Sequence, residues 1–172
     1  VTATLAGCSA SNTTTVTVNN LPIALAGNNS PVCDGDLLAL STNEEMASYQ
    51  WSGPNGFNNT TQNPTFIADI NAVGTYTVTI TDNNNCTATS NTVVTVNATP
   101  TVSINNETIC DSKSALLIAT VNTSGTFVWS DMQTGASISV TPSATTTYTV
   151  SFTGNNACTA TAEGIVSVNE NP

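Results

Sequence analysis

The stretch GTYTVTITD at residues 74–82 decides the fold, because its apolar side chains alternate strictly with threonines. This period-two pattern is typical of a β-strand with one buried face and one face in water. Residues 146–153 (TTYTVSFT) repeat it, and the chain shows no sustained helical period. Asn, Gly, Pro and Asp bound the alternating runs, which predicts short strands joined by turns. The expected fold is an all-β antiparallel sandwich.

A second regularity divides the chain into tandem units. The pattern Cys, nine residues, Val-Asn, two residues, Pro begins at Cys8, at Cys86 and again at Cys158. A period above 70 residues is too long for a solenoid repeat, so each unit has the length of a small domain. We predict three segments: residues 1–22 as the C-terminal hairpin and last strand of a truncated repeat, residues 23–100 as one repeat, and residues 101–172 as another.

The two longer units share their apolar positions. Before the tryptophan the matched pairs lie 78 positions apart: Leu38 and Leu116, Leu40 and Ile118, Trp51 and Trp129. After it the offset falls to 72, and the six extra residues of the earlier unit fall in the turn-like stretch 53–59. We place its strands near 23–27, 37–42, 47–52, 64–69, 74–82 and 87–97. The matched aromatics are expected at the core centres: Trp51, Tyr76, Trp129 and Tyr148.

Charge narrows the possible functions. The formal net charge is −10, with Lys113 as the only base and no histidine or arginine. Without a basic patch, neither nucleic acid nor an anionic membrane surface is an expected partner. No apolar run has the length of a membrane span, so direct membrane insertion is not expected. A hydroxyl nucleophile would have only Lys113 as its base, and we therefore predict a protein that is not an enzyme.

Candidate ligand-binding residues lie in turns. Asp34 and Asp36 share one turn, and Asp82 precedes three asparagines, so calcium is the one cofactor that these oxygen ligands would suit. The set is incomplete and the same residue types build ordinary turns, so the leading expectation is no cofactor. The extra turn, which contains Phe57 and Asn55, is expected to pack onto its own sheet. The alternative is that these two residues are exposed and contact a ligand.

Several stretches resemble known bacterial repeats. Residues 74–82 resemble the late strand of PKD-type and immunoglobulin-like repeats, residues 49–57 (YQWSGPNGF) resemble their middle strand and turn, and Asn85-Cys86 resembles their late hairpin. Such repeats form arrays on very large secreted surface proteins of Bacteroidota, including gliding-motility adhesins exported by the type IX system. The resemblance implies tandem Ig-like or PKD-like sandwiches of roughly seven strands in a head-to-tail rod, placed extracellularly at the cell surface.

The resemblance also bears on how the cysteines pair. Antibody-type domains have a cysteine where this chain has Val78, so their intersheet disulfide is not expected here. We expect one bridge per unit, Cys33 with Cys86 and Cys110 with Cys158, which leaves Cys8 unpaired. The alternative follows from strand direction. The first turn and the late hairpin of such a sandwich lie at opposite ends, too far apart for a disulfide, so that Cys33 could instead join Cys158 of the next unit. A third alternative is free thiols or a mixture of pairings.

Three functions are compatible with these features. The leading hypothesis is a non-catalytic structural stalk segment of an extracellular multi-repeat surface adhesin, whose partners are neighbouring repeats of the same protein. One alternative is a polysaccharide-binding Ig-like module. The other is a filament subunit that joins identical chains by β-strand exchange through residues 1–22.

Overall fold

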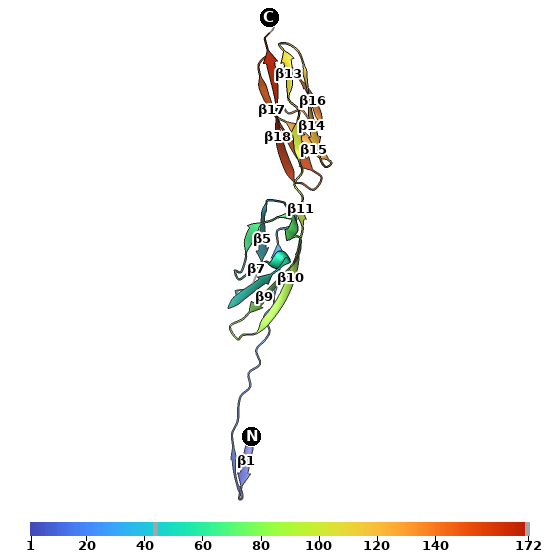
Figure 1. Ribbon diagram of the computed structural model, residues 1–172. Helices are drawn as coiled ribbons and strands as arrows, with labels where there is room; N and C mark the ends of the chain where they lie inside the picture. The colour runs from blue at the N-terminus through green and yellow to red at the C-terminus, as the bar shows by residue number, and fades with distance from the viewer. Residues whose placement is uncertain (43–44, 171–172) are drawn as a thin grey trace.

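The computed structural model describes residues 1–42 and 45–170. An N-terminal hairpin, an extended segment and two β-sandwiches follow one another along the chain, and the two sandwiches lie end to end (Figure 1). Among these residues, the helical elements are two single turns of 3-10 helix, η1 (Pro54–Gly56) and η2 (Ile70–Ala72). Within the described residues, no helix is long and apolar enough to cross a membrane.

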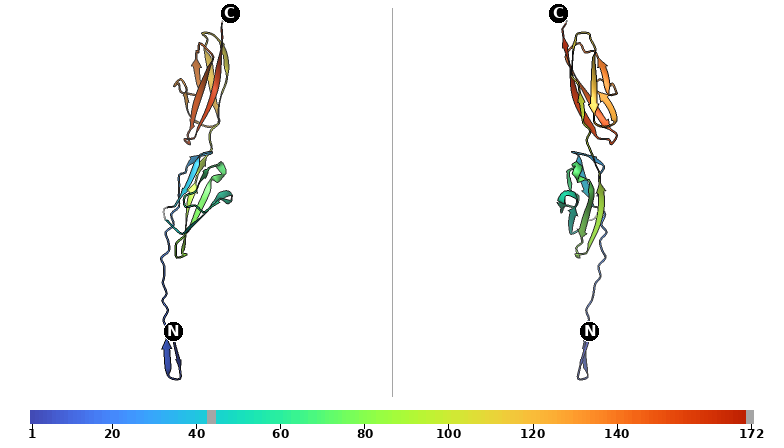
Figure 2. Two further views of the ribbon diagram at one scale, coloured as in Figure 1. Left: turned by 90° about the vertical axis from the view of Figure 1, so that its left-hand side faces the viewer. Right: turned by 45° about the vertical axis from the view of Figure 1, so that its right-hand side comes forward.

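The N-terminal hairpin packs on neither sandwich (Figure 2). Strands β1 (Thr2–Leu5) and β2 (Cys8–Ser11) pair antiparallel, and residues 1–20 are all exposed. The last strand expected within residues 1–22 is not formed, since residues 12–26 belong to no sheet. The equivalent strand of the next unit, β11 (Val96–Asn97), is held by pairing with β4 (Val32–Cys33). Residues 12–22 have no counterpart of β4 beside them, which explains the difference.

The second unit, residues 23–100, is built from two main sheets, and β4 and β11 form a separate two-stranded parallel sheet. One sheet has the order β3 (Gly27–Asn28), β5 (Leu37–Ser41), β8 (Thr65–Ile67). The other has the order β10 (Thr87–Val94), β9 (Gly74–Thr81), β6 (Ser48–Ser52), β7 (Asn58–Asn59). The expected first strand at 23–27 is instead the two short strands β3 and β4, which lie on either side of the cis Ser30–Pro31 bond. Strand β7, in the extra turn, was not predicted.

The third unit repeats this order. One sheet contains β12 (Val102–Ile104), β14 (Ala115–Val121) and β16 (Ser137–Val140). The other contains β13 (Glu107–Cys110), β18 (Thr159–Asn169), β17 (Thr146–Gly154) and β15 (Gly125–Trp129). In both units the second part of the divided first strand pairs parallel with the end of the last strand. Both units are therefore immunoglobulin-like sandwiches, and the predicted all-β sandwich fold is confirmed.

Each sandwich has its own hydrophobic core, and the register of one strand corrects the sequence alignment. Leu38 and Leu40 of β5 are buried, whereas their proposed matches Leu116 and Ile118 are 52% and 46% exposed. Leu117, the residue between them, is buried instead. The true offset in this strand is 77, the same as that between Cys33 and Cys110. A slip of one residue turns every side chain to the opposite face of a sheet, so the alignment with an offset of 78 is wrong here.

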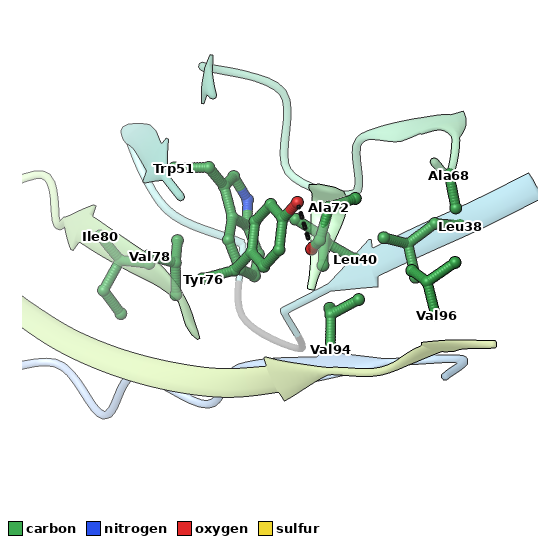
Figure 3. Close-up of a cluster of buried hydrophobic side chains, with 10 residues drawn as sticks. All are labelled: Leu38, Leu40, Trp51, Ala68, Ala72, Tyr76, Val78, Ile80, Val94 and Val96. Carbon is green, nitrogen blue, oxygen red and sulfur yellow. Dashed lines mark hydrogen bonds between the residues drawn. The ribbon is translucent and has the colours of Figure 1, made fainter. Parts of the chain in front are cut away.

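The core aromatics take different positions in the two units. Trp51 and Trp129 are buried, and their indole Nε1 atoms donate to the carbonyls of Gln62 (3.1 Å) and Gly135 (2.9 Å). Tyr76 is buried as well and belongs to the same cluster of the second unit as Trp51 (Figure 3). Tyr148 is only half-buried and packs against the edge of the third unit's core rather than at its centre.

Candidate functional site: the junction between the two units

The strand register places the cysteines of each unit at opposite ends of its sandwich. Cys33 lies beside Asn97, at the end of the last strand, whereas Cys86 lies eleven residues before Asn97, where that strand begins. Eleven residues of extended strand span about 36 Å, and a disulfide needs Cα atoms within about 7 Å. Cys110 lies beside Asn169 in the same way, eleven residues beyond Cys158. The expected bridges within units are therefore sterically impossible in this fold.

The disulfide in the structure joins the two units. Cys33, at the end of β4, bonds to Cys158, in the late hairpin of the third unit, with Cα atoms 5.7 Å apart. Cys158 is fully buried. The expected pairing of one bridge per unit is thus wrong, and the alternative drawn from strand direction is the arrangement found. It arises because the end of one unit that carries the first turn faces the hairpin end of the next.

Polar contacts accompany the bridge. The side-chain amide of Asn97 donates to the carbonyl of Asn156 (3.3 Å), and that of Asn156 donates to the carbonyl of Ala98 (3.0 Å). In the linker, the Thr99 hydroxyl donates to the carbonyl of Asp34 (2.8 Å), so that the linker is attached to the turn that follows Cys33. Covalent and hydrogen bonds together fix the junction at several points.

The bridge encloses most of both cores in one covalent loop. Cys33 and Cys158 are 125 residues apart in sequence. Every buried residue of the second unit's cluster lies between them, as does every one of the third unit's cluster except Val166. A chain held at its ends would therefore carry tension through the disulfide and around the two cores.

The remaining three cysteines are free. Cys8 and Cys110 are exposed, and Cys86 is partly exposed. Cys86 and Cys110 occupy the hairpin and the first turn of their units, at the two ends that do not face each other.

The three aspartates proposed for calcium are not brought together. Asp34 and Asp36 follow β4 at the junction, whereas Asp82 begins the hairpin at the opposite end of the unit. Asp36 accepts a bond from the Cys33 amide (3.3 Å), and Asp82 accepts bonds from the amides of Asn84 and Cys86 (2.8 Å each). These carboxylates stabilise turns. The described residues contain no group of three or more His, Cys, Asp or Glu side chains placed to hold a metal ion.

The extra turn of the second unit packs onto its own sandwich. The ring centroid of Phe57 lies 4.7 Å from that of Phe66 and 5.2 Å from that of Tyr76. The Asn55 side chain donates to the carbonyl of Asn71 (2.9 Å), which connects η1 to η2. An open pocket of about 210 Å³ borders these rings. The insertion identified this turn in the sequence, but the turn makes these contacts with its own sandwich.

No protein-family model and no curated protein matches the sequence. Similar solved structures include the insect immune protein hemolin, at 12% identity over 84% of this chain and 46% of that chain, with a TM-score of 0.49. The titin domains z1z2 in complex with telethonin match at 14% identity over 91% of this chain and 100% of that chain (TM-score 0.37). Murine CEACAM1b matches at 13% identity over 87% and 100% (TM-score 0.39). This chain spans about half the length of the hemolin chain, 46%.

Proposed function

We propose that this chain is a non-catalytic structural segment of an extracellular surface protein, in which Ig-like units in series act as a stalk. The main support for this proposal is the Cys33–Cys158 disulfide, which joins consecutive units beside a linker of only a few residues. Disulfides persist in oxidising compartments, which supports an extracellular location. The partners of each unit are then its neighbouring repeats, and adhesion belongs to other parts of the protein. Membership of a gliding-motility adhesin stays a prediction of the sequence resemblance.

Two connections between units resist bending and extension better than one. A single flexible linker allows one domain to swivel on the next, as is usual for small interfaces between domains. Here the linker and the disulfide hold the same junction, and the amides of Asn97 and Asn156 bond across it. Under tension the bridge also prevents the enclosed strands from being drawn out. Both properties suit a stalk.

Single-molecule stretching of the intact chain tests this function. With the bridge intact, the 125 residues between its cysteines cannot extend. Reduction should release them and add about 410–450 Å of contour length at 3.3–3.6 Å per residue. Cys158→Ser should release the same length without a reductant, whereas Cys110→Ser, which removes a free cysteine, should not. Equal contour lengths for the oxidised and reduced chains would contradict the proposal.

The sequence also suggests two alternative functions. Polysaccharide binding through Phe57 and Asn55 has less support, because the Phe57 ring stacks on Phe66 and Tyr76 and the Asn55 amide is bonded to Asn71. Strand exchange through residues 1–22 stays a prediction.

A further inference from the structure

The second and third units present the same first turn beside the end of their last strand. In the second unit, the amide of Asp34 donates to the carbonyl of Asn97 at 2.8 Å. In the third unit, the amide of Asp111 donates to the carbonyl of Asn169 at 3.0 Å. Cys33 and Cys110 thus occupy matched positions, and we call each of these turns, with its adjoining Asn, the receiving end of its unit.

The opposite ends of the two units also match. The hairpin before the last strand is closed by a bond from the Asp82 amide to the Cys86 carbonyl (3.0 Å) in the second unit. In the third unit it is closed by a bond from Gly154 to Cys158 (2.9 Å). The residue before each cysteine has a left-handed backbone, with φ of 63° at Asn85 and 65° at Ala157. We call this hairpin the hairpin end.

The asparagine that contacts the neighbouring unit is present in both hairpins. Asn156, two residues before Cys158, makes two polar contacts across the existing junction. Its backbone carbonyl accepts a bond from the Asn97 side chain, and its side-chain amide donates to the carbonyl of Ala98. Asn84 stands two residues before Cys86 and is exposed. In the N-terminal hairpin the corresponding residue is Ala6, in a tighter turn where Leu5 pairs directly with Cys8. The Cys86 hairpin therefore has both the cysteine and the asparagine found in the existing junction, whereas the Cys8 hairpin lacks the asparagine.

In this chain the receiving end at Cys33 is joined to the hairpin end at Cys158. The receiving end at Cys110 and the hairpin end at Cys86 are not joined to another unit. We propose that the receiving end at Cys110 binds the hairpin end of another unit of the 23–100 type and forms a Cys110–Cys86 disulfide, so that the same bridge joins successive units in series. This inference rests on the proposed function. The inference extends that function by naming the two ends that form the next junction. In it, Asn84 faces Asn169 as Asn156 faces Asn97.

The bond forms by thiol–disulfide exchange. The Cys110 and Cys86 thiols together lose two protons and two electrons as the sulfur–sulfur bond forms. A small-molecule disulfide such as oxidised glutathione takes them up and leaves as two thiols, through a mixed disulfide with one of the cysteines.

The test uses the full chain extended by one unit. Residues 1–172 with Cys86→Ser are followed directly by a second copy of residues 23–100 with Cys33→Ser, so that the only Cys86 hairpin lies in the appended unit and the only Cys33 in the parent chain. After equilibration in a buffer of reduced and oxidised glutathione, a non-reducing digest is analysed by mass spectrometry. We expect a Cys110–Cys86 linked peptide together with the Cys33–Cys158 linked peptide. With Cys110→Ser, the Cys86 peptide should be recovered free.

A pair of substitutions in the appended unit tests the role of the asparagine. Asn84→Ala should lower the equilibrium constant for forming the Cys110–Cys86 bridge against glutathione by about fivefold, the effect of one hydrogen bond. Asn83→Ala, at the adjacent exposed position, should leave the yield unchanged. Equal yields for the two variants would overturn this role.

The two proposals fail in different ways. If Cys33–Cys158 forms while Cys110 stays free, or while Cys110 captures Cys8 instead, this further inference is overturned and the proposed function stands. If Cys33–Cys158 is itself missing from the digest, the proposed function is overturned, and this inference with it.

Discussion

Tyr76 and Tyr148 hold the same place in the sequence repeat and serve different structural roles. The Tyr76 hydroxyl donates to the carbonyl of Ala72 (3.1 Å), four residues upstream, which closes the corner before β9. In the third unit the carbonyl of Ala144, also four residues upstream, accepts a bond from the Thr146 hydroxyl instead (2.7 Å). A tyrosine that closes a corner in this way is a recurrent feature of immunoglobulin-like sandwiches, and only the second unit has it.

Gly74 explains part of this difference. Its φ of 146° is one that other residues rarely adopt, and a Cβ atom there would lie 2.7 Å from Cγ of Pro54. Glycine thus lets the inserted turn η1 pack against the corner that Tyr76 closes. The third unit lacks the insertion and has Thr146 at this position.

Tyr76→Phe should lower the free energy of unfolding by about 1 kcal/mol, the net value of one hydrogen bond. Tyr148→Phe is the matched control and should have a smaller effect, because Tyr148 is half-buried and its hydroxyl makes no such bond with the residues that the structure describes. Urea unfolding at neutral pH measures both. A larger loss for Tyr148→Phe would contradict the assigned roles.

The same tyrosine predicts a dependence on alkaline pH. Burial first, and the Asp69 carboxylate second, raise the pKa of Tyr76 above its ordinary value of 10.0. A raised pKa in the folded state means that its contribution to stability is complete below about pH 10 and is lost as the pH rises further. Unfolding free energies measured from pH 8 to 11, with the three free cysteines changed to serine, should fall at the alkaline end. The fall should be smaller in Tyr76→Phe, and an identical fall would exclude this cause.

At the scale of the element, alternation with threonine predicts a strand and its buried face together. In β9, the buried residues are Tyr76, Val78 and Ile80, as the sequence indicates. Strand β14 reads ALLIATV and is apolar at five successive positions, so its pattern contains no period that fixes which residues face inward. Its register is set by pairing with β12 and β16, which the sequence of the strand does not reveal. The spacing of 77 residues between Cys33 and Cys110 was the sequence signal that could have given the correct register.

Two substitutions one residue apart test this register. Leu117→Ala should cost about 2–5 kcal/mol of unfolding free energy, because it leaves a cavity in the third unit's core. Leu116→Ala removes a side chain that is 52% exposed and should cost less than about 1 kcal/mol. Chemical denaturation of the two variants compares them directly, and the reverse ranking would restore the alignment with an offset of 78.

Only part of the junction could be predicted from the sequence. Strand direction alone places the first turn and the late hairpin at opposite ends of a sandwich, which limits the possible cysteine pairs. The facing of Asn156 and Asn97 depends on how one unit meets the next, and no periodic pattern within a strand encodes that. The Phe57 contacts were likewise unpredictable in detail, since they depend on how the inserted turn folds back over β9.

At the scale of the whole molecule, the bridge couples the stability of the two units. Closing a loop between residues 125 apart reduces the conformational freedom of the unfolded chain. The chain-entropy account gives about 4–5 kcal/mol for a loop of this length. The coupling is a property of the pair of units, because neither contains both cysteines of the bond.

Cys158→Ser should therefore lower the free energy of global unfolding by up to about 4–5 kcal/mol in non-reducing buffer. Cys110→Ser should leave it unchanged, since Cys110 is exposed and unbridged. Guanidinium unfolding followed by tryptophan fluorescence reports on both cores, because Trp51 and Trp129 lie one in each. Equal stability of the oxidised parent chain and Cys158→Ser would show that the bridge does not couple the units.

A non-reducing peptide map of the intact, oxidised chain shows directly whether a disulfide joins consecutive units. We expect one linked peptide pair that contains Cys33 and Cys158, with Cys8, Cys86 and Cys110 recovered as free thiols. A linked pair that contains Cys33 and Cys86, or Cys110 and Cys158, would contradict it.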